Sequence, residues 1–232
     1  MKILNLYCGI GGNRKMWGDE HDITAVELNP EIARIYQDFF PDDTVIVADA
    51  HEYLQEHYKE FDFIWSSPPC PSHSRMNYLL QQKGKNMVFP DMKLYEEIIL
   101  LKHMCKDAKW CVENVLPYYD YLIYPSQILG RHAYWANFYI TPKKFSTNNM
   151  IAGHTKAPDK LSSYRITGER QFLKKMTGFN LEKYTGIDKR KVLRNCVEPE
   201  AGLHILSCAD NDIDRYDQLE LFNQEETNAK CV

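Results

Sequence analysis

KILNLYCGIGGN, residues 2–13, joins a short apolar run to a turn that contains three glycines. The apolar run predicts a buried strand. Gly9, Gly11 and Gly12 follow it, and glycine lets a backbone turn sharply and approach a ligand closely. These three glycines do not complete the G-x-G-x-x-G fingerprint of dinucleotide-binding proteins, because its last glycine is missing. The turn therefore does not indicate phosphate binding. A structural turn without a ligand is the alternative interpretation.

The same alternation of apolar runs and helical patterns continues to about residue 140. Apolar runs predict strands at residues 2–7, 23–28, 44–48, 61–66, 109–115 and 133–140. Helical spacing predicts helices over residues 29–40 and 92–108. Strands that alternate with helices predict an α/β fold with a mostly parallel sheet and helices on both faces. A ligand of such a sheet binds at the carboxyl ends of the strands.

The composition is that of an ordinary globular protein of 232 residues, enough for one core and a small subdomain. No apolar run is as long as a membrane span, and the N-terminal apolar run is too short for a signal peptide. The seven cysteines have no regular spacing, which predicts reduced thiols in a cytoplasmic protein.

Charge is distributed unevenly along a chain whose formal net charge is −4. Residues 141–194 contain thirteen Lys and Arg against four Asp and Glu, whereas residues 207–232 contain two against seven. A basic segment in an acidic chain indicates a surface that binds a polyanion, with a solvated basic loop as the alternative. The predicted organisation is a catalytic and cofactor-binding domain over 1–140, a basic subdomain over 141–190, a returning helix over 191–208 and an acidic, flexible tail over 209–232.

Two carboxylates end the second and third predicted strands. Glu27 can accept hydrogen bonds from both hydroxyl groups of a ribose. Asp49 lies where it can accept a hydrogen bond from an adenine amino group. Either residue alone could simply cap a helix. Together with the glycine turn they predict a site for an adenosine without phosphates, which suggests S-adenosyl-L-methionine.

FDFIWSSPPCPSHS, residues 61–74, places a thiol on a stiff turn after the fourth predicted strand. Pro68, Pro69 and Pro71 surround Cys70 and fix backbone φ angles, which holds the sulfur in one place. Positioning of this kind suits a nucleophile. A buried inert thiol is one alternative, and half of a zinc site with His73 is another.

The ordered set of motifs resembles the DNA cytosine-5 methyltransferases, and its compact size is similar to that of the small, phage-type members. The resemblance rests on LYCGIGG at 6–12, AVELNPEIARIYQDFFP at 25–41, ADA at 48–50, SSPPCPSHS at 66–74, WCVENV at 110–115 and LRNCVEPEAGLHI at 193–205. It implies a Rossmann-like fold of the S-adenosylmethionine-dependent methyltransferases with a small target-recognition insertion. It also implies methyl transfer to C5 of cytosine in double-stranded DNA.

The resemblance assigns roles to residues of the predicted site. Cys70 would attack C6 of a flipped-out cytosine from an electropositive pocket that favours the thiolate. Glu113 would hydrogen-bond N3 if it holds or shares a proton, Asn114 would brace the thiol turn, and Arg131 would help to bind the base. The residues assigned to the cofactor are Tyr7, Cys8, Gly9, Ile10, Gly11, Gly12, Glu27, Leu28, Asp49, Ala50, Pro69, Asn195 and Val197.

Three positions depart from the family pattern. Pro71 stands where a glutamine usually follows the nucleophile, and Asn5 stands where an aspartate commonly opens the glycine motif. In the family an Arg-x-Arg pair contacts the cytosine; here Arg131 is followed by Ala133 at the second position.

The basic segment would read the DNA target. Phosphate contacts give affinity and base-edge contacts give sequence, with Arg suited to guanine and Asn to adenine. A segment this small predicts a short or degenerate target. The residues predicted to neutralise phosphates are Lys143, Lys144, Lys174, Lys175, Arg190 and Lys191. Those predicted to read base edges are Arg165, Arg170, Asn148 and Asn149.

The tail contains a further candidate motif. Gln218, Leu219, Leu221 and Phe222 resemble the peptide by which bacterial DNA enzymes dock on the replication sliding clamp. The alternative is that these apolar side chains pack on the parent domain.

Two rival functions remain open at this point. One keeps the chemistry and changes the substrate to cytosine in a structured RNA such as tRNA. The other is a non-catalytic DNA-binding protein that retains the cofactor fold.

Overall fold

A computed structural model describes residues 1–84, 86, 88–145 and 159–211, with side chains in the last range from residue 168 onward. Within these residues one sheet has the strand order β3-β2-β1-β4-β5-β7-β6. The pairs among β1 to β5 are parallel, whereas β7 runs antiparallel to both β5 and β6. The strands are β1 (Lys2–Leu6), β2 (Asp22–Glu27), β3 (Thr44–Val47), β4 (Phe63–Ser66), β5 (Lys109–Val115), β6 (Gln127–Leu129) and β7 (His132–Ala136).

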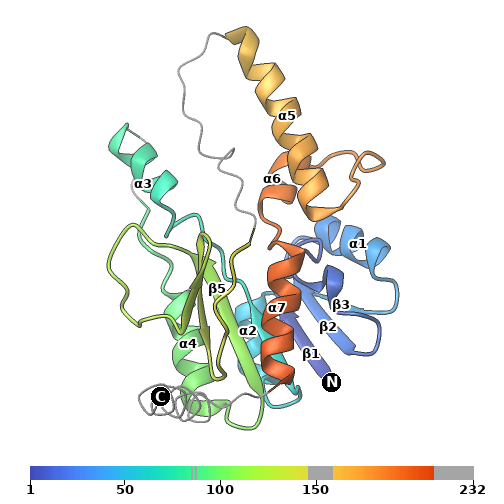
Figure 1. Cartoon of the computed structure of the whole chain (residues 1–232), viewed down its shortest axis with the longest axis vertical. Helices are drawn as coiled ribbons and strands as arrows, with labels where there is room; N and C mark the ends of the chain where they lie inside the picture. Colours follow the sequence, from blue (N-terminus) through green and yellow to red (C-terminus); the bar gives the residue numbers. More distant parts are fainter. Residues whose placement is uncertain (85, 87, 146–158, 212–232) are drawn as a thin grey trace, which may run out of the picture.

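Helices cover both faces of this sheet (Figure 1). Side chains of α2 and α4 pack on one face in a core that includes Leu4, Leu6 and Ile64. On the other face, side chains of α7 join a core with Phe63 and Trp65. The helices are η1 (Arg14–Met16), α1 (Pro30–Phe39), α2 (Ala50–His57), α3 (Arg75–Gln82), α4 (Lys93–Met104), α5 (Asp159–Thr177), α6 (Lys189–Arg194) and α7 (Pro199–Asp210).

The glycine turn after β1 packs closely against the link between α6 and α7. A Cβ atom on Gly12 would lie 2.5 Å from the carbonyl oxygen of Val197. A Cβ atom on Gly202, in α7, would collide with the backbone of Asn13. Gly12 was predicted to let a ligand approach the backbone closely. In the structure it lets the backbone at Val197 approach instead.

Residues from α5 to α6 pack on α1 rather than on the sheet. Phe179 and Tyr184 lie against Phe39, with ring centroids 4.8 and 6.1 Å apart. The Tyr184 hydroxyl donates to Asp38 Oδ2 over 3.0 Å, and Lys15 Nζ lies 3.9 Å from the centroid of the Phe179 ring. This part of the predicted basic subdomain thus shares a small core with the cofactor side of the molecule.

The predicted α/β fold with helices on both faces is confirmed. The single returning helix predicted over 191–208 is wrong, because the structure has two helices, α6 and α7, in this region. Pro199 explains the break: it takes the first position of α7, where its missing N–H group costs nothing, but it could not continue α6. The sequence analysis also did not predict β6, η1, α2, α3 or α5.

Several predictions lie outside the described residues. These are the clamp-docking motif Gln218, Leu219, Leu221 and Phe222, and the base-reading candidates Asn148 and Asn149. Among the helices that the structure describes, none has the length and apolar character needed to cross a membrane. The six cysteines within the described residues are free thiols.

Candidate active site

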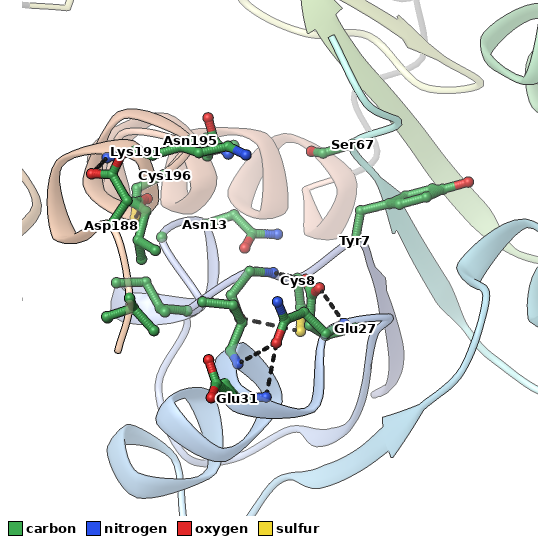
Figure 2. A pocket seen from close by; sticks show the side chains of 18 of the residues that line it. Tyr7, Cys8, Asn13, Glu27, Glu31, Ser67, Asp188, Lys191, Asn195 and Cys196 are labelled. Atoms are coloured by element: carbon green, nitrogen blue, oxygen red, sulfur yellow. Dashed lines mark hydrogen bonds between the residues drawn. The ribbon is translucent and has the colours of Figure 1, made fainter. Parts of the chain in front are cut away.

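A pocket of about 360 Å³ opens beside the carboxyl ends of β1 and β2. The turn after β1 and the N-terminus of α1 form one side, and residues 186–197 form the other. Figure 2 shows Cys8 and Glu27 across the pocket from Asp188, Lys191 and Asn195. A pocket at strand ends is the usual ligand site of such a sheet.

Glu27 is held in place by backbone amides on both of its oxygens. Gly9 N donates to Oε2 over 3.1 Å and Asn29 N donates to Oε1 over 2.9 Å. Each carboxylate oxygen can accept a second hydrogen bond. Glu27 can therefore accept from two ligand hydroxyl groups without losing the contacts that orient it, as a ribose site requires.

The structure brings together most of the predicted cofactor residues. Those that line the pocket are Tyr7, Cys8, Gly9, Ile10, Gly12, Glu27, Asn195 and Val197. Those that do not line it are Gly11, Leu28, Asp49, Ala50 and Pro69.

Local packing explains the positions of the second group. A Cβ atom on Gly11 would meet the Phe40 ring, Leu28 is largely exposed, and Ala50 is buried in the core. Asp49 caps α2 by accepting from the amides of residues 51 and 52, and its Oδ2 lies 3.2 Å from Lys93 Nζ. Contacts of these residues with a bound cofactor stay predictions.

Sequence reasoning missed the wall of the pocket that residues 186–192 supply. These residues lie at the end of the basic segment, and no motif marked them. The signal available in the sequence was the Asp188 cap of α6, whose Oδ1 accepts from Lys191 N over 3.0 Å. The pocket residues that were not predicted are Asn13, Asn29, Glu31, Ile32, Ser67, Gly186, Ile187, Asp188, Lys191, Val192 and Cys196.

Cys70 lies on the turn between β4 and α3. Its carbonyl oxygen accepts from the amides of His73 and Ser74, both over 3.1 Å. Asn114 Nδ2 donates to Pro68 O over 2.9 Å, so β5 holds the turn from the neighbouring strand end. The contact between Asn114 and the thiol turn that the bracing role requires is therefore present.

Glu113 and Cys70 interact across the ends of β5 and β4. Burial, and to a smaller extent the Glu113 charge, together raise the pKa of Cys70 to about 11. The expected electropositive pocket that would favour the thiolate is therefore wrong for the free protein. The thiol is therefore protonated at neutral pH in the free protein, and neutralising the Glu113 charge would remove only the smaller of the two effects that raise its pKa.

The side chain found near Glu113 is His132, which the sequence analysis did not predict. Arg131 lies in the exposed turn before β7, where its charge lowers the pKa of Glu198 against the larger raising effect of burial. Ala133 is fully buried on the α2 and α4 face of the sheet. His132 Nε2 lies 3.7 Å from Glu113 Oε1.

Glu97, a buried residue of α4, accepts hydrogen bonds from three surrounding elements. Tyr7 OH donates to Oε1 over 2.6 Å and Ser66 Oγ donates to Oε2 over 2.5 Å. His51 Nδ1 lies 3.0 Å from Oε1, and this contact raises the pKa of His51. Tyr7 has a φ of 54°, which is rare for a residue with a side chain. Glu97 thus holds the ends of β1 and β4 and the start of α2 together beneath the site.

Two predicted phosphate contacts are engaged elsewhere. Arg190 Nε lies 2.8 Å from Glu169 Oε2, and Lys191 lines the pocket. Arg170, a predicted base reader, lies 3.4 Å from Glu182 Oε1. Lys143, Lys144 and Lys175 are exposed and Lys174 is partly exposed; of Arg165 the structure describes only its place in α5.

Comparison with solved structures places the fold among methyltransferases. The methyltransferase EhMeth of Entamoeba histolytica is 13% identical, covers 93% of this chain and 99% of its own, and superposes with a TM-score of 0.53. A mutant DNMT2 of Spodoptera frugiperda is 26% identical over 49% of this chain and 35% of its own, with a TM-score of 0.34. A search of curated proteins found no match. The molecule has the Rossmann-like fold of the S-adenosylmethionine-dependent methyltransferases.

The family model of the C-5 cytosine-specific DNA methylases matches residues 1–115. This part, which holds the glycine turn, the thiol turn and β5, is similar to that family. The match implies a methyltransferase that acts on C5 of cytosine, and its cofactor is S-adenosyl-L-methionine. The pocket fits this cofactor, because Glu27 offers free acceptor positions for a ribose while Ile10, Ile32 and Val192 offer apolar contacts.

Proposed function

We propose that the protein methylates C5 of cytosine in double-stranded DNA through a covalent bond between Cys70 and C6 of a flipped-out base. The observation that carries the proposal is the interaction of Cys70 with Glu113 at adjacent strand ends. This pair is the acid and nucleophile that the chemistry needs. Extrusion of the base from the duplex costs roughly a few kcal/mol in lost stacking and pairing.

The proposed reaction begins when the Cys70 thiolate adds to C6. The displaced π electrons move through the ring to N3, which accepts a proton from Glu113. Asn114 keeps the sulfur in place by its hydrogen bond to Pro68 O. S-adenosyl-L-methionine, when bound, supplies the methyl group that C5 accepts. Loss of the C5 proton then allows the bond between sulfur and C6 to break, which restores the aromatic ring.

Ionisation of Cys70 is the step that the free protein resists. The Glu113 charge contributes to the raised pKa of the thiol. A proton on Glu113 removes that contribution and also supplies the acid for N3. One protonation event therefore prepares both partners, which supports their assignment as a pair.

The test is a trapping experiment with labelled S-adenosyl-L-methionine and duplex DNA that contains 5-fluorocytosine. Fluorine replaces the C5 proton, so the enzyme cannot complete the elimination and should remain bound covalently to the DNA. The wild-type protein should form a labelled adduct and Cys70→Ala should not. Cys208→Ala, which changes a partly exposed thiol in α7, is the matched control and should react like the wild type.

The rival substrate is separated by the same assay. Equal concentrations of duplex DNA and of a structured RNA with the same substitution are compared. If an adduct forms only with the RNA, structured RNA replaces DNA as the proposed substrate. An intact biological effect in Cys70→Ala would favour the non-catalytic DNA-binding protein instead.

A further inference from the structure

His132 lies on the face of β7 that Glu113 shares. In the antiparallel register Glu113 pairs with Tyr134 and Val115 pairs with His132. Side chains two residues apart on a strand point to the same face, so His132 and Tyr134 both face the Glu113 side. Ala133 points to the opposite face and is fully buried. An arginine at position 133 could not reach Glu113 in this register.

The geometry of the pair suits proton exchange. His132 Nε2 lies 3.7 Å from Glu113 Oε1. The Glu113 side chain is 8% exposed, whereas the His132 side chain is 29% exposed. A small movement of either side chain closes the gap to a hydrogen bond, and the exposure of the imidazole allows it to exchange protons with water.

We propose that His132 is a positioning residue that shares one proton with Glu113 and holds this carboxyl group ready for N3 of the cytosine. The inference rests on the proposed function, since N3 is recognised only if cytosine is the substrate.

The proton balance of the reaction follows from this assignment. The pair holds one proton before the base arrives. As the sulfur adds to C6, the π electrons reach N3, and the proton moves from Glu113 to N3. When C5 forms its bond to the methyl group, the electrons on N3 re-form the bond to C4, and N3 returns the proton to the pair. His132 and Glu113 end the cycle as they began it.

Charged and titratable groups from neighbouring elements also face the pair. Cys70, on the turn after β4, has a pKa that the Glu113 charge raises, so a proton held by the pair favours the thiolate. Burial raises the pKa of Tyr134 well above its usual range, so this group stays protonated.

Glu198, at the start of α7, has a pKa that burial raises and that Arg131 lowers. The variants below do not replace these groups, and because the Glu113 charge raises the pKa of Cys70, Glu113→Gln is compared only with its own double variant.

The experiment measures the rate of adduct formation on 5-fluorocytosine DNA as a function of pH. His132→Gln should react about 10- to 100-fold more slowly, which is part of the effect of a positioned acid. Its rate should also begin to fall at lower pH than that of the wild type, because Glu113 alone must then keep the proton. His57→Gln is the matched control, since His57 also pairs with a glutamate, Glu60 over 2.8 Å, but lies on α2. It should behave as the wild type.

A double-mutant comparison tests whether His132 acts through Glu113. In a Glu113→Gln background, the additional change His132→Gln should have little further effect. An equally large effect in that background, or an unchanged rate and pH profile in His132→Gln alone, would overturn the inference. If the wild type itself forms no adduct, the proposed function fails, and this inference fails with it. Melting temperatures show which variants are folded, and His132→Asn replaces the glutamine variant if that one is not.

Discussion

At the scale of single residues, the thiol of Cys70 is stable rather than reactive in the free protein. Burial and the charge of Glu113 both raise its pKa, to about 11. A thiol in this state is protected from electrophiles at neutral pH. Protonation of Glu113 removes the smaller of these two effects, so the thiolate forms more easily when this carboxyl group holds a proton.

Alkylation of Cys70 should accordingly be slow at neutral pH. Because the thiolate is the reacting form, the rate should rise about tenfold per pH unit until pH about 11. Iodoacetamide labelling followed by mass spectrometry measures this rate at Cys70. Glu113→Gln should shift the curve to lower pH. Rapid labelling of Cys70 at pH 7 in the wild type would contradict the prediction.

The sequence predicted both partners of this pair but not their electrostatic state. Cys70 and Glu113 each stand in a short motif at the end of a strand, so their order along the chain identified them. The raised pKa depends on how deeply the turn is buried and on the approach of β5 to β4, neither of which a linear pattern encodes. His132 was missed for the same reason, since its role depends on the register between β5 and β7.

At the scale of elements, α4 holds the site from beneath through Glu97. Its carboxylate joins Tyr7, Ser66 and His51, which belong to three different segments. A buried carboxylate with several partners leaves them unsatisfied when it is lost. The helix therefore does more than cover the sheet, because it fixes the strand ends from which the cofactor and thiol turns start.

Glu97→Gln should lower the free energy of unfolding by about 2–3 kcal/mol, as expected for lost hydrogen bonds to a buried charge. Glu97 raises the pKa of His51, so the stabilisation from this pair is complete below about pH 6.5 and is lost as the pH rises through the raised value. The variant should lose this pH dependence.

Denaturant unfolding at several pH values measures both effects. Glu96→Gln, on the same helix with a side chain 60% exposed, should change stability by less than about 0.5 kcal/mol. Equal effects of the two substitutions would refute the role of the buried carboxylate.

Long apolar runs predicted the central strands of the sheet, whereas short elements with weak patterns were not predicted. The run from Lys109 to Val115 appears as β5 with the predicted bounds, because a buried strand is apolar along its length. β6 is only three residues long, too short for a periodic signal. α2 was missed because it is only eight residues long, although Asp49 was recognised as a possible helix cap.

At the scale of the whole molecule, cofactor site and basic segment are parts of one packed unit. Phe179 and Tyr184, which follow α5, lie on α1, and α6 then lines the pocket. The sequence indicated the basic character of this region but could not indicate that it forms a wall of the cofactor site. That arrangement depends on contacts between residues more than a hundred positions apart.

Removing charge from the end of α5 should weaken DNA binding without changing its sequence preference. Lys174→Gln with Lys175→Gln should reduce the slope of log affinity against log salt concentration by about 2, since each phosphate contact contributes about 0.9. Fluorescence anisotropy over a range of salt concentrations measures the slope. Lys102→Gln, in the last turn of α4, with Lys106→Gln, just after this helix, removes the same charge and should leave the slope unchanged. An identical slope for both double variants would exclude α5 from the DNA surface.

The contact of Gly12 with Val197 has a consequence for the synthesis of the protein. Ribosomes extend a chain from its N-terminus, so the glycine turn emerges early, whereas the segment that faces it across the pocket emerges only after some 180 further residues. A nascent chain can form β1 to β5 before this segment leaves the exit tunnel, yet it lacks one side of the cofactor site. The chain can therefore form the complete cofactor site only late in its synthesis, after residues 186–197 have packed against the glycine turn.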